Sequence, residues 1–220
     1  MKKIAALLVC VMSVGLLGGC GNSFDASAYT KAVLDNAYKN DSTGFVELEV
    51  GTAEESAEVY QEGLDAVVDS WLTAYEITDD YEADFEAIFA DILSNVKYTV
   101  GEAEKQDDDS FIVTVTYEQM NVFAPAIEAY TTTVTELTAA WVEAAAAGEE
   151  IPTEDEMVAE LVIALEDNLK NSLANVTYDE AATTTIRIEL VDNVYTPNTD
   201  DLATFESVIF DYEEMEEVVY

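Results

Sequence analysis

The sequence predicts an α+β fold, in which an antiparallel sheet of about four strands packs against several amphipathic helices. Over most of the chain, apolar residues recur every three or four positions, which is the spacing of amphipathic helices. In shorter segments the spacing drops to two, as in strands with one buried face. Helices come in runs and strands come in pairs, so a parallel sheet, whose strands alternate singly with helices, is not expected.

The first half of the chain predicts three helices and a hairpin. Asp25 and Ser27 can cap the first helix, and Thr52 and Glu55 have the spacing of a capping box at the start of the second. An acidic turn at 106–109 separates two segments of alternating apolar residues and so predicts the hairpin. The expected elements are helices at 25–40, 52–76 and 79–96, a short strand or extended segment at 45–50, and strands at 97–104 and 110–119.

The second half predicts a similar order of elements. Gly148 is expected to end a long helix, and Thr153 and Glu156 form a second capping box. The expected elements are helices at 125–147, 153–173 and 200–214 and strands at 176–179 and 183–191. Residues 93–98 match 173–178 at an offset of 80, so two helix-helix-hairpin repeats, at 52–121 and 122–195, are one interpretation. Convergence of two similar helix-to-strand transitions is the other.

The N-terminal segment predicts a secretion signal and an anchor. Lys2 and Lys3 precede an uncharged run, and the segment Leu17-Gly18-Gly19-Cys20 that closes it resembles a lipobox. Removal of a signal peptide at 1–19 makes Cys20 the first residue, with a diacylglyceryl thioether carrying acyl chains such as palmitate, followed by a tether at 20–24. A retained transmembrane helix needs roughly 20 apolar residues, more than this run offers. An ordinary signal peptide, cut at a small-x-small site, is the other alternative, but no better site lies nearby.

The mature chain is strongly acidic. Residues 25–215 are expected to form a single domain and 216–220 an acidic tail. Without residues 1–19 the chain holds six basic and 47 acidic residues, a formal charge of −41. Nucleic acid and anionic lipid headgroups are disfavoured as partners because both need basic patches. A cationic or neutral extracellular ligand remains open, as does a charged shell that only keeps the protein soluble.

Residue types that carry catalysis are scarce. The chain has no histidine, and its two cysteines are Cys10, inside the signal, and Cys20. Ser-His and Cys-His systems and the common transition-metal sites are therefore excluded, and no cofactor or metal is predicted. The run Asp107-Asp108-Asp109 lacks the ligand spacing of an EF-hand, so a solvated turn is expected. Arg187 is expected to point away from its apolar strand neighbours and to pair with carboxylates.

Three parts of the chain carry a resemblance to known proteins. They are residues 25–29 together with 34–38, residues 95–103, and residues 205–212. In these segments the chain resembles uncharacterised acidic lipoproteins of anaerobic Gram-positive bacteria. The resemblance implies a surface-exposed, membrane-tethered α+β domain, and it carries over no catalytic or binding residue.

These observations predict a lipoprotein anchored at the extracytoplasmic face of the cell membrane, of Gram-positive type. Its expected role is that of a non-catalytic binding or envelope-associated module. A carboxylate-dependent glycan hydrolase is one alternative, because that reaction needs only two carboxyl groups about 5–10 Å apart. A solute-binding component of a transporter is a further alternative. Cys20, as the lipidation site, is the one site residue that the sequence nominates.

Overall fold

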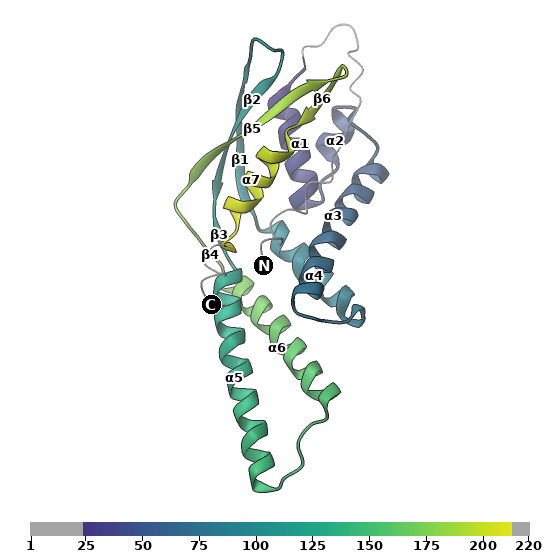
Figure 1. Ribbon diagram of the computed structural model, residues 1–220. Helices are drawn as coiled ribbons and strands as arrows, with labels where there is room; N and C mark the ends of the chain where they lie inside the picture. The colour runs from purple at the N-terminus through teal and green to yellow at the C-terminus, as the bar shows by residue number, and fades with distance from the viewer. Residues whose placement is uncertain (1–23, 213–220) are drawn as a thin grey trace. The chain divides into compact units, whose positions relative to one another are not determined.

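A computed structural model describes residues 24–212 of the chain (Figure 1). The predicted lipidation site Cys20, the signal peptide and the tail at 216–220 lie outside these residues. The described chain forms two compact units, which are treated separately: unit 1 is the part up to Gln119 with Asp179–Ile209, and unit 2 is Met120–Tyr178 with the part from Phe210 on. Because the chain passes between the units three times, neither is one continuous stretch. The single-domain and repeat assignments remain predictions.

Unit 1 combines an antiparallel sheet with helices. Its strands follow the order β1-β2-β5-β6, and every neighbouring pair is antiparallel. The predicted α+β class and the four-stranded antiparallel sheet are therefore confirmed. The elements are α1 (Ala26–Lys39), α2 (Thr43–Glu47), α3 (Ala53–Ala74), the short 3₁₀ helix η1 (Asp79–Tyr81), α4 (Glu82–Ser94), β1 (Lys97–Lys105), β2 (Phe111–Glu118), β5 (Ala182–Val191), β6 (Val194–Pro197) and α7 (Thr199–Ile209).

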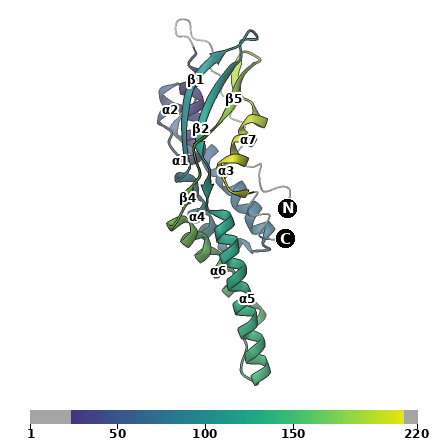
Figure 2. The ribbon, with the colours of Figure 1, turned by 90° about the vertical axis from the view of Figure 1, so that its left-hand side faces the viewer.

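One face of this sheet is covered by helices and the other is open. Val113 on β2 and Ile186 and Ile188 on β5 are fully buried, while Thr114 is exposed. The ring of Phe205, from α7, packs edge-on against the rings of three tyrosines on α1, β1 and β2: Tyr38, Tyr98 and Tyr117. Figure 1 shows α1 between the sheet and α3, and Figure 2 turns the open face of the sheet toward the viewer. The alternation is the one expected when a single face meets the core.

The helical layer of unit 1 supplies most of the aromatic core. Tyr29, Trp71 and Phe85 are completely buried. Two polar side chains are buried with them, and they satisfy each other: the Ser56 hydroxyl donates to Asn36 Oδ1, and Asn36 Nδ2 donates to the Ser56 carbonyl at 3.2 Å. This pair ties α1 to α3. Such buried polar groups are tolerated because their hydrogen bonds are made inside the core.

Three elements of unit 1 differ from the sequence-based prediction, and the first is the segment at 45–50. Residues 45–50 were expected to be extended, but the helix α2 occupies Thr43–Glu47. The Asp41 carboxylate accepts a hydrogen bond from the Thr43 N–H at 2.9 Å, which favours a turn here. Phe45 and Val50 are buried while Val46 is 47 % exposed, so the apolar run does not line one strand face.

The fourth strand of the sheet is also not the predicted one. Residues 176–179 were expected to pair with 183–191, but β4 (Thr177–Tyr178) pairs with β3 (Met120–Asn121) in unit 2. The place in the sheet is taken by β6, which follows β5 after a two-residue turn. The closing helix was expected at 200–214, but α7 ends at Ile209 because Phe210 leaves it to form a bridge with Met120.

Unit 2 consists mainly of two helices, α5 (Phe123–Ala147) and α6 (Glu154–Ala174). Gly148 ends α5 at a φ of 74°, as predicted, and the capping box of Thr153 and Glu156 starts α6. The start of α5 has no local cap, because Val122 offers no side-chain acceptor. Asp211 replaces it and accepts from two backbone N–H groups, those of Phe123 at 2.9 Å and Ala124 at 2.8 Å. Among residues 24–212, no helix is both long and apolar enough to cross a membrane.

Candidate functional site: a groove on the β5–β6 hairpin

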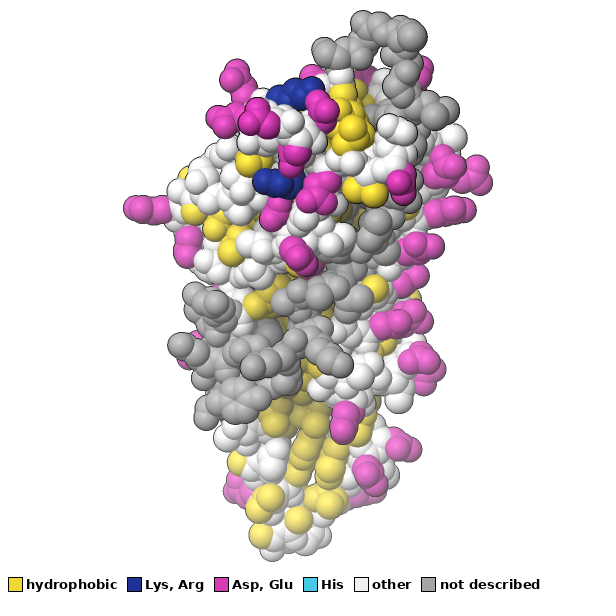
Figure 3. Space-filling model, turned by 45° about the horizontal axis from the view of Figure 1, so that its top comes forward, with side chains coloured by type: hydrophobic (Ala, Val, Ile, Leu, Met, Phe, Trp, Pro, Cys, Tyr) yellow, Lys and Arg dark blue, Asp and Glu magenta, His cyan; other side chains and the backbone are white. Residues whose placement is uncertain are grey.

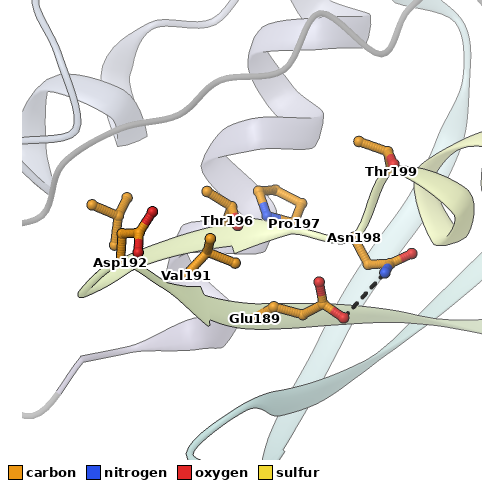
Figure 4. Close-up of a pocket in the computed structure, with 8 residues that line it drawn as sticks. Glu189, Val191, Asp192, Thr196, Pro197, Asn198 and Thr199 are labelled. Atoms are coloured by element: carbon orange, nitrogen blue, oxygen red, sulfur yellow. Dashed lines mark hydrogen bonds between the residues drawn. The ribbon is translucent and has the colours of Figure 1, made fainter.

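A groove of about 550 Å³ lies on the β5–β6 hairpin of unit 1 (Figure 4). It is formed by two strands and by the start of the segment that leads into α7. The sequence did not nominate this site. Its lining residues are Glu189, Val191, Asp192, Val194, Thr196, Pro197, Asn198 and Thr199.

The hairpin forms because its turn residues accept a left-handed backbone. Val191 pairs with Val194, and the two residues between them, Asp192 and Asn193, have φ angles of 51° and 65°. Two consecutive positive φ angles give the tight turn whose twist matches that of paired strands, and Asp and Asn are among the few residues that adopt it readily. An Asp-Asn pair between two valines is therefore the signal that could have located β6 in the sequence.

Register places most of the groove on the open face of the sheet. Glu189 pairs with Thr196 and Val191 with Val194, so these four side chains share the face opposite to Ile188. Asn198 closes one end of the groove, and its Nδ2 donates to Glu189 Oε1 at 3.1 Å, as the dashed line in Figure 4 marks. Carboxylates and hydroxyls thus surround two valine side chains. Such a surface suits a ligand that presents hydrogen-bond donors or a positive charge.

The edge of β6 offers little to a strand-like partner. The Tyr195 carbonyl accepts a hydrogen bond from the Tyr29 hydroxyl at 3.2 Å, and Pro197 has no backbone N–H. Proline on an edge strand limits further pairing. A ligand at this hairpin would therefore meet side chains in the groove rather than an open backbone edge.

An aromatic cluster covers the other face of the same hairpin. The ring of Phe24, the first described residue, stacks on Tyr195 with the centroids 3.9 Å apart and the planes 8° from parallel. Phe24 also lies 5.6 Å from Phe111, on β2, and 5.5 Å from Tyr29, on α1. Burial raises the pKa of Tyr29 to about 12. The N-terminal end of the described chain is therefore fixed to the hairpin that carries the groove.

The turn at 106–109 and Arg187 lie as the sequence predicted. Asp108 accepts from the Ser110 hydroxyl at 2.6 Å and from the Ser110 N–H, and these bonds lower the pKa of its carboxyl. Asp109 pairs with Lys105 at 2.6 Å. Arg187 points away from its buried neighbours, and its Nη1 lies 3.7 Å from Asp108. Within residues 24–212 no group of three or more acidic or cysteine side chains could hold a metal ion.

Each basic side chain of the described chain has a partner within the protein. Four lysines pair with carboxylates, and Lys39 donates to the Val96 carbonyl at 3.2 Å. On the face that Figure 3 shows, acidic side chains are scattered widely and the few basic ones lie among them. Exposed charge of one sign repels ligands of the same sign, and that polyanions are poor partners stays a prediction. The lysine pairs are Lys31–Asp35, Lys97–Glu118, Lys105–Asp109 and Lys170–Glu166.

Carboxyl groups with a raised pKa occur elsewhere. Burial raises the pKa of Asp211, although its bonds to backbone N–H groups oppose this. On the α3–α4 surface, partial desolvation and the neighbouring Asp65 raise the pKa of Glu86, and Gln61 Nε2 donates to Asp65 at 2.7 Å. Neither Asp211 nor Glu86 lines the groove. Asp211 serves as a helix cap, which is a structural role.

A second polar cluster joins two of the segments that carry the resemblance. Tyr98 Oη, on β1, donates to Asp35 Oδ1, on α1, at 2.6 Å, and the ammonium of Lys31 binds the same carboxylate. Lys39 Nζ lies 5.4 Å from the centroid of the Tyr98 ring. Burial, and then the bond and charge of Asp35, raise the pKa of Tyr98. This cluster ties α1 to the sheet, and none of its residues lines the groove.

Comparison with known proteins gives a likeness of fold. No protein-family model and no curated protein match the chain. Among solved structures, the chain is similar to a putative lipoprotein (ycdA) from Bacillus subtilis subsp. subtilis str. 168, with a TM-score of 0.57 and 13% sequence identity. The match covers 85% of this chain and 56% of the other, so this chain spans little more than half of its neighbour's length. At this identity the likeness concerns the α+β fold alone.

Proposed function

We propose that this protein is an extracytoplasmic lipoprotein, anchored through Cys20, whose folded chain acts by binding and performs no chemistry of its own. The observation that carries this is the position of Phe24. The lipobox-like segment ends at Cys20, and four residues later the chain is already packed against the sheet. An anchor on Cys20 would therefore hold the folded body close to the membrane surface.

Two further observations support an anchored protein. The neighbour in Bacillus subtilis is a putative lipoprotein and shares the fold over most of this chain. The acidic surface suits an exposed position, since high net charge keeps a protein soluble.

The groove supports binding as the activity. Glu189 and Asp192 give it negative charge, and Asn198 and Thr196 add polar side chains. The ligand class that fits is a cationic or hydroxyl-bearing extracellular molecule, such as a basic peptide segment or a neutral glycan.

The anchor is tested by fatty-acid labelling of cells that produce Cys20→Ala or the matched control Cys10→Ala. Cys10 lies inside the predicted signal, so its replacement should leave the label and the membrane fraction unchanged. Cys20→Ala should lose all incorporated fatty acid, because no other cysteine remains in the mature chain. Fatty acid retained by Cys20→Ala would rule out this anchor.

The binding role is tested by crosslinking in intact cells followed by recovery of the anchored protein. The groove variant combines Glu189→Gln with Asp192→Asn, and the control combines Glu58→Gln with Glu62→Gln, two exposed acids on α3. Both variants remove two negative charges. A partner lost only from the groove variant supports the proposal, whereas equal recovery from both variants places binding elsewhere.

The glycan hydrolase remains the second candidate, and the same variants discriminate it. Glycoside hydrolysis requires two carboxyl groups across a cleft, one of them with a raised pKa. The groove holds two carboxyls, but the raised pKa values described above belong to Asp211 and Glu86. Sugar release from cell-wall glycan that disappears in Glu189→Gln would favour the hydrolase. A transporter component would instead need two α/β lobes, an arrangement that neither unit has.

A further inference from the structure

Both hairpin turns of unit 1 lie at the same end of its sheet. Phe111, at the start of β2, pairs with Lys105, at the end of β1, and with Ile188, near the end of β5. The β1–β2 turn at 106–110 and the β5–β6 turn at Asp192 therefore project from the same end of the sheet. This end, with the two turns and Leu190 and Val191, is called the hairpin end.

The ring of Phe24 is held at the hairpin end. Its stacking partner Tyr195 is the second residue of β6, and its other ring contacts are Phe111 and Tyr29. Asp25 caps α1 immediately afterwards, accepting from the Ala28 N–H at 2.9 Å. Two neighbouring residues thus fix the point at which the chain leaves the folded unit.

The distance from this point to Cys20 is short by covalent geometry. Cys20 and Phe24 are four residues apart, and a fully extended chain spans at most about 14 Å over that length. Two acyl chains on Cys20 would hold that residue at the bilayer surface. Phe24 then lies within about 14 Å of the lipid headgroups.

We infer that the hairpin end of unit 1 faces the lipid surface in which Cys20 is anchored, so that the groove lies next to the membrane. The inference rests on the proposed lipidation. In this orientation the opposite end of the sheet, where β2 finishes at Glu118, is directed away, and β2 separates the two ends by about 23 Å. The ligand of the groove would then be a molecule that lies at the membrane surface.

The side chains of the hairpin end suit a lipid surface of low charge. Leu190 and Val191 are 40 % and 50 % exposed beside the turn, and apolar side chains gain from contact with the headgroup and acyl boundary. Asp107 and Asp192 carry negative charge at the two turns, which anionic headgroups repel. Contact should therefore be closer on zwitterionic than on anionic vesicles, and the difference should shrink as salt screens charges beyond about 8 Å.

The test uses fluorescence energy transfer from single labelled cysteines to an acceptor on lipid headgroups. The lipidated protein is placed in phosphatidylcholine vesicles, with the label at Asp107→Cys on the hairpin end or at Glu118→Cys on the far end. Labelling is specific because Cys20, the other cysteine, is acylated. We expect several-fold stronger transfer from position 107 than from position 118, and equal or reversed transfer would overturn the inference.

Two tether variants show whether Phe24 sets this orientation. Phe24→Ala should bring the transfer from the two positions closer together, while Phe24→Tyr, which keeps a stacking ring, should preserve the difference. If Phe24→Ala does not fold, six Gly and Ser residues inserted before Phe24 serve instead and should reduce transfer from position 107. Unchanged transfer with the longer tether would contradict the inference.

Vesicle flotation separates this inference from the proposed function. A protein that carries no fatty acid and does not float with vesicles refutes both. A protein that floats but shows no gradient between positions 107 and 118 refutes the orientation alone and leaves the anchor intact.

Discussion

The Phe24 ring lies flat on that of Tyr195, 3.9 Å between centroids, four residues after the predicted lipid-bearing Cys20. Tyr195 is at the same time the residue whose carbonyl accepts from buried Tyr29. One short hairpin is thus connected to the tether on one face and carries the groove on the other. This relationship links the anchor to the candidate binding site without any contact beyond unit 1.

Phe24→Ala should lower the free energy of unfolding of unit 1. A stacked aromatic pair contributes about 0.5–1.5 kcal/mol beyond the area that it buries. Phe24→Leu keeps apolar area but loses the stacking on Tyr195, so its effect should be smaller than that of Phe24→Ala. Urea unfolding of the chain without its acyl groups measures both. If Phe24→Leu is as stable as the native chain, the stacking geometry contributes nothing.

Tyr98→Phe should destabilise unit 1 by about 1.5–3 kcal/mol, the usual value for a hydrogen bond to a charged group. The hydroxyl that is removed donates to Asp35 at 2.6 Å, and Lys31 remains bound to the same carboxylate. Asp35→Asn should also destabilise, because it weakens both contacts. A double-mutant cycle of the two changes measures their coupling, and additive effects would show that the bond is energetically unimportant.

The stability of unit 1 should fall in alkali between pH 10 and about 12. Tyrosine in the unfolded chain ionises near pH 10, whereas burial raises the pKa of Tyr29 to about 12. The folded state therefore keeps a proton that the unfolded state loses, so the stabilisation is complete below pH 10 and is lost as the pH rises through the folded pKa. Tyr29→Phe should flatten this part of the curve, which circular dichroism in urea follows. A steeper decline in Tyr29→Phe would contradict the assignment.

The elements that the sequence predicted well have local signals. Thr52 and Glu55, and again Thr153 and Glu156, lie three residues apart, and both capping boxes form as expected. The long amphipathic helices and the β1–β2 hairpin follow from periodicity, since several residues in a row support the same pattern.

The elements that the sequence did not predict are short or depend on contacts between residues far apart in the chain. β6 has four residues and includes Pro197, which argues against a strand unless its position at the sheet edge is known. The groove was missed with it, because the side chains that line it meet only once the Asp192 turn is formed. Asp211 acts on Phe123 from 88 residues away, and no local pattern indicates that contact.

Asp211→Ala should destabilise unit 2 more than Thr153→Ala does. Asp211 caps α5 by accepting from the N–H groups of Phe123 and Ala124. Because Phe123 is buried, removal of the Asp211 carboxylate leaves a buried N–H donor without that acceptor, which costs about 1–3 kcal/mol. Thr153 caps α6 in an exposed capping box, where water can replace it, and should cost about 1 kcal/mol. Thermal unfolding compares the two variants, and an equal loss would show that burial adds nothing to the cap.

The stability that Asp211 contributes should decrease as the pH rises, the reverse of what is usual for a carboxylate cap. Burial raises the pKa of Asp211 above its usual value of 3.8, so the folded state binds a proton at a pH where the unfolded state has already released it. Stability from this group is therefore complete below pH 3.8 and declines as the pH rises through the folded pKa. The stability difference between the native chain and Asp211→Asn, measured in urea, should be larger near pH 4 than near pH 7. A difference that grows toward neutral pH would mean that the backbone N–H groups, which favour the carboxylate, outweigh burial.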